Sequence, residues 1–276
     1  MPAAPLTSLD RMAVHTFTTK PWSLAEAVAG YADAGIPGIS VWRQHLQGVG
    51  IEAGARLIKD AGLAVPAFVR GGFFTAHDAK DRAAAIDDNK RCLDEAAAIG
   101  ADQVVLVVGA TPGMPLAEAR KQVRDGIAAC VDHAKAVGVK LAIEPLHPMY
   151  AGDKSCVNSM RQAREIWSEL GEQVGVAADV YHIWFDQDLA EEIKLAGEAR
   201  RIFGFHVCDW KCNTSDLLLD RGLMGEGCID IRGIRGLVED AGFTGWIEVE
   251  IFSNTHWLKV QREWLDEVVT AYRECT

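Results

Sequence analysis

Carboxylate and imidazole side chains are concentrated at the ends of four consecutive apolar segments in the second half of the chain. They are Glu144 and His147 in LAIEPLHP, Asp179 and His182 in VGVAADVYHIWFD, His206 and Asp209 in FGFHVCDW, and Glu248 and Glu250 in GWIEVEIF. If these ends meet in one place, repulsion among the carboxylates is unfavourable unless a cation neutralises it. Oxygen ligands with a single imidazole suit Mn²⁺, Mg²⁺, Co²⁺ or a catalytic Zn²⁺, whereas a closed structural zinc site favours thiolates. The segments therefore predict one bound divalent metal ion.

One ligand from each segment gives the predicted set Glu144, Asp179, His206 and Glu250. Any one of these residues alone would more often be a helix cap, an ion-pair partner or a hydrogen-bonded core group. Four of them on successive segments favour a metal site. The choice of Glu250 as the fourth ligand is the least certain from spacing alone, because Glu248 and Glu250 lie on the same face of a strand. Glu250 is preferred because it is nearer the end of its segment.

Short apolar runs alternate with amphipathic stretches along the whole chain. Eight runs predict strands over residues 12–16, 38–42, 65–69, 103–108, 140–145, 174–178, 202–208 and 246–251. The stretches between them predict helices, for example over residues 23–34, 81–99, 115–137, 157–170 and 231–241, many followed by a capping glycine. Eight β-then-α units predict a closed parallel barrel, a single (β/α)8 TIM barrel over residues 1–276, whose active site lies at the carboxyl ends of the strands. An open doubly wound sheet is the alternative, but no predicted strand is followed by G-x-G-x-x-G or G-x-x-x-x-G-K-S/T.

The bulk composition limits the class of protein. The chain has 276 residues, 49% of them apolar, and its formal net charge of −11 repels a phosphate backbone, so nucleic acid is not an expected partner. The start MPAAPLTSLD lacks the basic and apolar parts of a secretory signal, and the apolar run 104–108 is too short to span a bilayer. The seven scattered cysteines form no C-x-x-C pair, as expected of reduced thiols. We expect a cytoplasmic protein that does not contact membranes.

The four segments resemble the xylose-isomerase-like TIM-barrel superfamily of sugar isomerases and epimerases, which also holds D-tagatose 3-epimerase, hydroxypyruvate isomerase, inosose dehydratase and endonuclease IV. The resemblance covers nearly the whole chain and is carried by IEPLHP, the D-x-x-H that begins at Asp179, HVCDW, GEGCID and GWIEVE. It implies one Mn²⁺- or Mg²⁺-type site, with Mn²⁺ favoured, formed by Glu144, Asp179, His206 and Glu250. It thereby implies Glu250 over Glu248. A small carbohydrate-like substrate and a homo-oligomer are implied as well.

The segment that follows Glu144 departs from the ketose 3-epimerases of this superfamily, which have an asparagine, an arginine and a second glutamate there. In this chain the segment contains His147, Pro148, Met149 and Tyr150. The string EPLHP is similar instead to the large subunits of C-glycoside deglycosidases, lyases of 3-oxo-glycosides in which a histidine at this place acts as a base. This local resemblance implies a lyase with a small partner subunit. The endonuclease branch needs more histidine ligands than these segment ends supply.

The shared reaction that the resemblance implies is removal of a proton next to a carbonyl, with the metal as the Lewis acid that stabilises the enediolate. For a sugar or sugar phosphate isomerase or epimerase, we assign Glu144 and Glu250 as the acid–base pair and His182 as a group that binds a substrate oxygen. The alternative is a metal-dependent lyase or dehydratase of oxo-sugars, such as a 3-oxo-glycoside-cleaving subunit or an inosose dehydratase. There, His147 would be the base and a β-substituent would leave. A non-catalytic sugar-binding barrel would need no metal.

Further candidates are predicted to contact the substrate. Arg70 ends the third predicted strand in FVRGGFF and suits a substrate oxygen or a phosphate, and Arg221 is a second such cation. Aromatic rings near the same end would stack on the apolar face of a sugar. They are Trp42, Phe73, Phe74, Trp184 and Trp210, of which we assign Trp184 and Trp210 to substrate binding. His15, at the end of the first strand, is a further residue within reach of this end.

Overall fold

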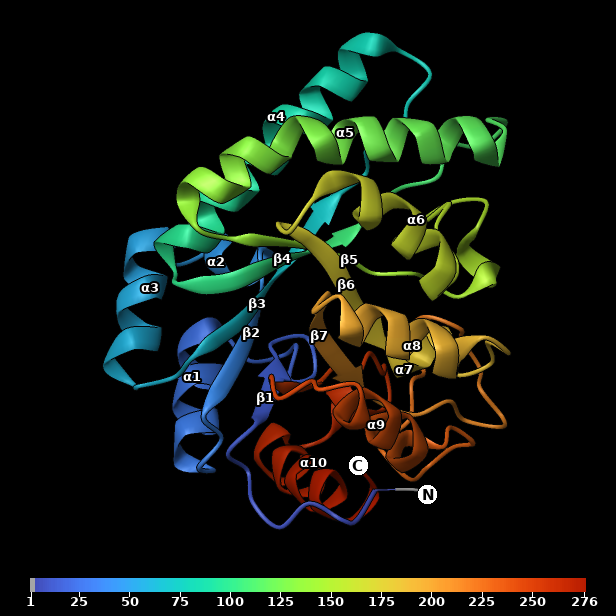
Figure 1. Cartoon of the computed structure of the whole chain (residues 1–276). Coiled ribbons are helices and arrows are strands. Elements are labelled where there is room, and N and C mark those ends of the chain that lie inside the picture. Colours follow the sequence, from blue (N-terminus) through green and yellow to red (C-terminus); the bar gives the residue numbers. More distant parts are fainter. Residues whose placement is uncertain (1–2) are drawn as a thin grey trace.

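The computed structural model of the protein describes residues 3–276 and shows a closed barrel of parallel strands surrounded by helices (Figure 1). Its strands are β1 (Met12–His15), β2 (Gly38–Trp42), β3 (Val65–Gly72), β4 (Ala101–Val107), β5 (Lys140–Ile143), β6 (Val174–Asp179), β7 (Ile202–Val207) and β8 (Ile247–Val249). Consecutive strands pair in parallel, and β8 closes the ring by pairing with β1. The predicted (β/α)8 TIM barrel is therefore confirmed. Met1 and Pro2, which belong to the predicted domain 1–276, lie outside the described residues.

Helices cover the outside of this barrel. They are α1 (Leu24–Asp33), α2 (Gln44–Gln47), α3 (Ile51–Asp60), α4 (Ala79–Ala98), α5 (Leu116–Val137), α6 (Met160–Leu170), α7 (Val180–Ile183), α8 (Leu189–Glu198), α9 (Ile231–Asp240) and α10 (Gln261–Cys275), with 3₁₀ turns η1 (Pro148–Tyr150) and η2 (His256–Leu258). The long helices α4 and α5 pack against each other along one flank (Figure 1). The helix predicted over residues 157–170 begins later, at Met160, because the Ser159 side chain accepts a hydrogen bond from the backbone N–H of Gln162 and so caps the helix at that point.

The strand register brings the polar side chains together in neighbouring layers inside the barrel. Asp179 on β6 is opposite His206 on β7, and His206 is opposite Glu248 on β8. Beyond β8, which pairs with β1, His15 on β1 is opposite Ser40 on β2. Side chains that point into a closed barrel form layers. Closure between β1 and β8 therefore brings residues from both ends of the chain into one site.

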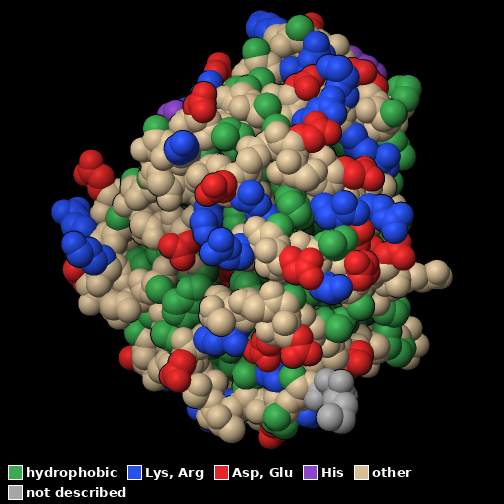
Figure 2. Space-filling model, in the orientation of Figure 1, with side chains coloured by type: hydrophobic (Ala, Val, Ile, Leu, Met, Phe, Trp, Pro, Cys, Tyr) green, Lys and Arg blue, Asp and Glu red, His purple; other side chains and the backbone are tan. Residues whose placement is uncertain are grey.

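The outer surface carries charges of both signs. Figure 2 shows Lys and Arg side chains interspersed with Asp and Glu over the face that it draws. Some of these charges pair along a helix, as Lys121 does with Asp125 on α5. Exposed pairs of this kind contribute little to stability, so the buried strands and inner helix faces hold the fold together. Within residues 3–276, each helix is too short or too polar to cross a membrane.

Candidate metal centre

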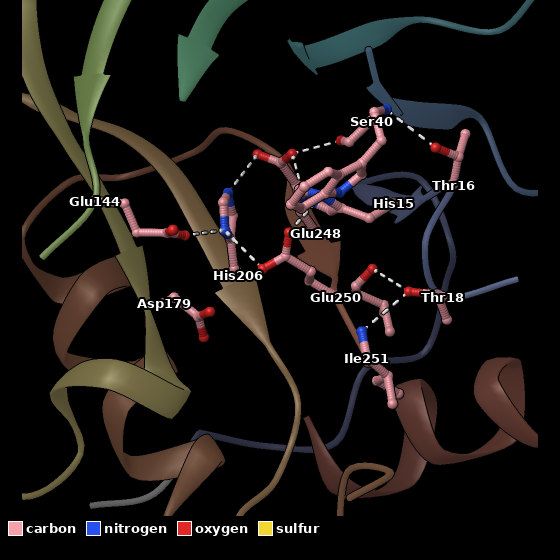
Figure 3. A network of polar contacts seen from close by, with 12 residues as sticks. His15, Thr16, Thr18, Ser40, Glu144, Asp179, His206, Glu248, Glu250 and Ile251 are labelled. Atoms are coloured by element: carbon pink, nitrogen blue, oxygen red, sulfur yellow. Dashed lines mark hydrogen bonds and ion pairs between the residues drawn. The ribbon is translucent and has the colours of Figure 1, made fainter. Parts of the chain in front are cut away.

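Four side chains from four neighbouring strands meet at the carboxyl end of the barrel. Glu144 follows β5, Asp179 ends β6, His206 lies on β7, and Glu250 follows β8. One potential ligand atom from each lies within 4.8 Å of those of the other three, and all four residues are buried. In Figure 3, the side chains of Glu144, His206 and Glu250 converge and that of Asp179 lies beside them. The structure thus brings together the four residues that the sequence predicts as ligands.

Local hydrogen bonds leave one atom of each residue directed toward this cluster. Asp179 caps α7 by accepting the backbone N–H of Tyr181 at Oδ1, at 2.8 Å, which leaves Oδ2 for other partners. His206 Nδ1 lies 3.1 Å from Glu144 Oε1 and 3.9 Å from Glu250 Oε2. The backbone N–H of Glu250 donates to the carbonyl of Val207 on β7, which fixes the position of the residue after β8 ends.

The cluster has the chemistry of a divalent metal site. Its donors are three carboxylates and one imidazole, all buried. Arg221 contacts two of them, with Nη1 2.9 Å from Asp179 Oδ2 and 3.3 Å from Glu250 Oε2. Once His206 gives up its proton to act as a ligand, one guanidinium does not balance three carboxylates in this buried site, whereas an added divalent cation does. Oxygen-rich ligands with one imidazole fit Mn²⁺, Mg²⁺, Co²⁺ or a catalytic Zn²⁺, so the residues present fit the predicted metal.

Neighbouring charges shift the pKa values of these groups. Burial lowers the pKa of His206, but the surrounding carboxylates, Glu248 above all, outweigh burial and raise the pKa to about 10. Burial raises the pKa of Asp179 to about 6, although Arg221 opposes this shift. Burial acts on Glu250 in the same direction, but His15 and Arg221 hold the pKa of that carboxyl well below its usual range. Without a metal, the cluster therefore keeps a proton on His206 at neutral pH.

Metal affinity is expected to rise with pH, because His206 must lose this proton before Nδ1 can act as a ligand. Between the pKa of Asp179 near 6 and that of His206 near 10, binding should release one proton and affinity should rise up to about tenfold per pH unit. Below about pH 6, Asp179 is also protonated in the free protein and the dependence becomes steeper. Calorimetric titration with Mn²⁺ in two buffers of different ionisation enthalpy counts the protons. Binding without proton release at pH 7.5 would contradict this assignment.

A second polar group adjoins the cluster inside the barrel (Figure 3). Ser40 Oγ on β2 donates to Glu248 Oε2 on β8 at 2.5 Å. His15 on β1 lies between two carboxylates, with Nε2 3.3 Å from Glu248 Oε2 and Nδ1 3.0 Å from Glu250 Oε1. Burial lowers the pKa of His15, but Glu250 and Glu248 outweigh burial and raise it. The sequence indicates that His15 is within reach of this end and that Glu248 and Glu250 share a strand face, but it does not predict Ser40 or the contacts within this group.

A cavity of about 450 Å³ opens beside the cluster. Several of the predicted site residues line it, namely Glu144, Glu250, His182, Arg70 and Arg221. The pairing of β3 with β4 shifts register between Val69 and Gly71, and Arg70 lies at this shift. Irregularities of this kind change the direction of a side chain and are common next to active sites. Its guanidinium lies 4.3 Å from the ring centroid of Phe73, which also lines the cavity. A separate cavity of about 500 Å³ at the amino end of the barrel is lined by other residues.

One wall of the cavity beside the cluster is aromatic. The rings of Phe17 and Trp42 stack with their centroids 4.3 Å apart, and Phe252 contacts both of them edge-on. Trp257 extends the wall, and the Lys20 ammonium lies 4.3 Å from its ring centroid. A flat apolar wall opposite polar groups suits a sugar ring, which has an apolar face and polar edges. Of these residues, the sequence indicated only Trp42.

His182 and Arg221 face each other in the cavity. The backbone N–H of His147 donates to His182 Nδ1 at 3.2 Å, and His182 Nε2 lies 3.7 Å from Asp179 Oδ2 and 3.2 Å from Arg221 Nη2. Burial and the adjacent Arg221 lower the pKa of His182 well below its ordinary value, so the ring is neutral. A neutral ring has one accepting nitrogen, so it accepts either the His147 N–H at Nδ1 or the Arg221 guanidinium at Nε2. The imidazole therefore supplies one donor and one acceptor beside the N–H groups of Arg221.

Three predicted site residues lie away from the cavity lining. The ring of Trp210 packs against those of Trp184 and His147, at centroid distances of 5.9 and 5.1 Å. After β5 the chain enters the 3₁₀ turn η1, and His147 begins this turn by accepting the Met149 N–H at Nδ1. Its ring then packs edge-on against Phe185, 4.6 Å away. His147 and the two tryptophans thus belong to one aromatic cluster beside the site, and their predicted roles stay predictions.

Replacement of His147 by Ala is expected to leave turnover nearly unchanged and to lower stability by about 1 kcal/mol, the usual effect of removing a turn-capping hydrogen bond with some packing. The backbone N–H that orients His182 remains in this variant. Steady-state kinetics and thermal unfolding measure the two effects. A loss of kcat of a hundredfold or more, in a variant that is folded, would instead indicate that His147 is the base.

A closed eight-stranded barrel with buried carboxylates and an imidazole at the carboxyl ends of its strands defines a TIM barrel with a candidate metal centre. The sequence matches the family described as xylose isomerase-like TIM barrel over residues 28–268, and the chain belongs to this family. The inosose isomerase of Bacillus licheniformis is 27% identical over 219 residues, which cover 72% of this chain and 74% of that relative.

Two solved structures are similar over almost the whole chain. Protein SMc04130 from Sinorhizobium meliloti 1021 has 46% sequence identity and a TM-score of 0.95, with 97% of this chain and 99% of that chain covered. The IOLI protein with a binding zinc atom has 22% identity and a TM-score of 0.84, with 95% and 96% of the two chains covered. At 22% identity, the similarity to the IOLI protein shows a shared fold.

Proposed function

We propose that the protein is a divalent-metal-dependent isomerase or epimerase of a sugar or sugar-like oxo compound. The observation that carries this proposal is the convergence of Glu144, Asp179, His206 and Glu250 beside a cavity with an aromatic wall. The inosose isomerase relative supports the reaction class, and the zinc atom of the IOLI protein supports a metal in this fold. Mn²⁺ is our preferred ion because the donor set is rich in carboxylate oxygen.

Glu144 and Glu250 are the acid–base groups in this proposal. The metal, when bound, supplies a Lewis acid that stabilises negative charge developing on the substrate carbonyl. Glu144 and Glu250 follow different strands, β5 and β8, and both line the cavity. One carboxylate takes a proton from the carbon next to the carbonyl. In epimerisation, a carboxylate returns a proton to the opposite face of the same carbon. In isomerisation, a carboxylate returns a proton to the former carbonyl carbon, while the proton of the neighbouring hydroxyl moves to the former carbonyl oxygen.

The remaining cavity residues bind and orient the substrate. His182 and Arg221 lie side by side in the cavity lining, so a substrate oxygen there can accept from the guanidinium and contact the imidazole. Arg70 lines the same cavity and offers a further donor to a substrate oxygen. The wall of Phe17 and Trp42 packs on the apolar ring face and excludes water from that side.

The lyase alternative has less support from the geometry. It needs His147 as the base, and the ring of this residue packs against Phe185 and Trp210 while its Nδ1 accepts the Met149 N–H. Glu144 and Glu250, by contrast, line the cavity directly. The arrangement therefore favours return of the proton to the substrate over expulsion of a β-substituent.

Incubation of the Mn²⁺-supplemented protein in D₂O with a panel of inososes, ketoses, ketose phosphates and 3-oxo-glycosides tests the proposed function. NMR and mass spectrometry should show one deuterium incorporated and a new isomer of unchanged composition apart from that exchange. Loss of water or of an aglycone would assign the protein to the lyases. Absence of exchange across the panel, with metal bound, would count against proton abstraction next to a carbonyl.

A further inference from the structure

Glu248 is a fully buried carboxylate that the proposed reaction does not use. It lies inside the barrel with no exposed surface. Its contacts within residues 3–276 are Ser40 Oγ at 2.5 Å and His15 Nε2 at 3.3 Å from Oε2, and His206 Nε2 at 3.8 Å from Oε1. An ionised carboxylate in the interior is strongly unfavourable unless its partners compensate. Two of these partners are imidazoles, and each of the two also contacts a predicted metal ligand.

Rigid strands, and not loops, set these contacts. His15 and Ser40 are register partners on β1 and β2, and His206 and Glu248 are register partners on β7 and β8. Gly204, two residues before His206 on the same strand, leaves the space between the last two groups. A Cβ at that position would lie 3.2 Å from His206 Nε2 and 3.3 Å from Glu248 Oε1, closer than side chains ordinarily pack.

The negative charge of Glu248 lies on the opposite side of the His206 ring from the other predicted ligands. Its Oε1 is 3.8 Å from Nε2, an ion-pair distance, while Nδ1 faces Glu144 Oε1 at 3.1 Å and Glu250 Oε2 at 3.9 Å. If a cation takes the place of the Nδ1 proton, the remaining ring proton is at Nε2. The adjacent charge of Glu248 stabilises that form and so favours binding through Nδ1.

His15 has the corresponding effect on Glu250. Its Nδ1 lies 3.0 Å from Glu250 Oε1, while its Nε2 contacts Glu248. With Oε1 held in this way, the other oxygen of Glu250 lies on the cluster side, 3.3 Å from Arg221 Nη1 and 3.9 Å from His206 Nδ1. Figure 3 shows the continuous chain of contacts from Ser40 through Glu248 and His15 to Glu250.

We propose that Ser40, Glu248 and His15 form a positioning layer that presets His206 Nδ1 and Glu250 Oε2 for a divalent cation. The layer acts through the two ligands and does not touch the substrate cavity, whose lining includes none of its three members. This inference rests on the metal site of the proposed function, and it is independent of the substrate and of the reaction.

The test is titration of the metal-free full-length protein with Co²⁺, followed by calorimetry and by the visible absorption bands of the bound ion. Glu248→Gln keeps the size of the side chain and removes the carboxylate. We expect Co²⁺ to bind about 10- to 100-fold more weakly, the usual effect of losing a partner that orients a ligand, and the absorption bands to shift. The matched control is Glu192→Gln, which removes a carboxylate that is also buried but pairs with Arg164 on the outer helices. The control should bind Co²⁺ like the unchanged protein.

Unchanged affinity and an unchanged spectrum in a folded Glu248→Gln protein would overturn the positioning layer and leave the metal site intact. Failure of the unchanged protein to bind Co²⁺ would overturn the metal site and the layer together. If Glu248→Gln does not fold, Ser40→Ala takes its place, because it removes only the hydroxyl that holds Glu248. A severalfold loss of Co²⁺ affinity with a band shift supports the layer, and unchanged binding refutes it.

Discussion

Replacement of Glu250 by Gln is expected to lower kcat about a thousandfold, because a positioned acid–base group contributes 10²- to 10⁴-fold to the rate. The same change removes a predicted metal ligand, so Mn²⁺ affinity should fall by more than the 10- to 100-fold loss that follows removal of an orienting partner. Kinetics at saturating Mn²⁺ separate the two effects. A rate defect that persists when the site is full reports the proton-transfer role, and a defect that Mn²⁺ repairs reports metal binding alone.

Glu192→Gln is again the matched control, since Glu192 is buried to the same degree as Glu250 and lies on α8, outside the cavity. It should lose stability through its broken pairs with Arg161 and Arg164 while keeping kcat and Mn²⁺ affinity. The site assignment would be refuted by a Glu250→Gln protein that retains both full activity and full metal affinity. The comparison distinguishes a specific role of Glu250 from the general effect of removing a buried charge.

The strands and the four converging residues could be predicted from the sequence for a common physical reason. Parallel strands buried on both faces appear as short apolar runs, and β1 and β6 are buried along their whole length. In a closed barrel the carboxyl ends of all strands lie at one rim. The position of a polar residue at a strand end can therefore be predicted even when the loop conformations are unknown. Asp179 and His206 satisfy this condition, since both lie at the ends of their strands in register.

The predicted site residues that do not line the cavity, such as His147 and Trp210, have side-chain directions that strand position does not set. His147 follows β5, but the 3₁₀ turn η1 directs its ring toward Phe185, and this turn has no periodic signal. Trp210 follows β7 and stacks on Tyr181, with centroids 4.7 Å apart, and does not line the cavity. Sequence order places such residues near the rim, but only the backbone path of each loop determines which side of the rim they face.

The positioning layer was beyond prediction for a different reason. Its members come from both ends of the chain, and Ser40 and Glu248 are 208 residues apart in sequence. Their contact exists only because β8 closes on β1 and both side chains point inward in adjacent layers. Each residue alone has an ordinary place in a strand. Only the contacts among the three residues indicate a function, and these contacts form when the barrel closes.

Replacement of Arg221 by Met is expected to destabilise the metal-free protein by about 3–5 kcal/mol, because it removes the guanidinium that contacts two buried carboxylates, Asp179 and Glu250. The long apolar side chain of Met retains packing against Tyr181 and Phe252, whose ring centroids lie 4.5 and 4.7 Å from the guanidinium carbon. A bound divalent cation supplies positive charge to the same two carboxylates. The penalty should therefore be smaller in the Mn²⁺-saturated protein than in the metal-free protein.

Thermal or denaturant unfolding of the Arg221→Met protein with and without Mn²⁺ measures this difference. Arg164→Met provides the matched comparison, since Arg164 pairs with the buried Glu192 at 2.7 Å on the outer helices. Its penalty should be the same whether or not Mn²⁺ is present, because its partner lies outside the cluster. If the penalty at Arg221 is equally insensitive to Mn²⁺, the ion does not share its carboxylates, and the metal centre must lie elsewhere. A penalty that shrinks only at Arg221 locates the bound ion at Asp179 and Glu250.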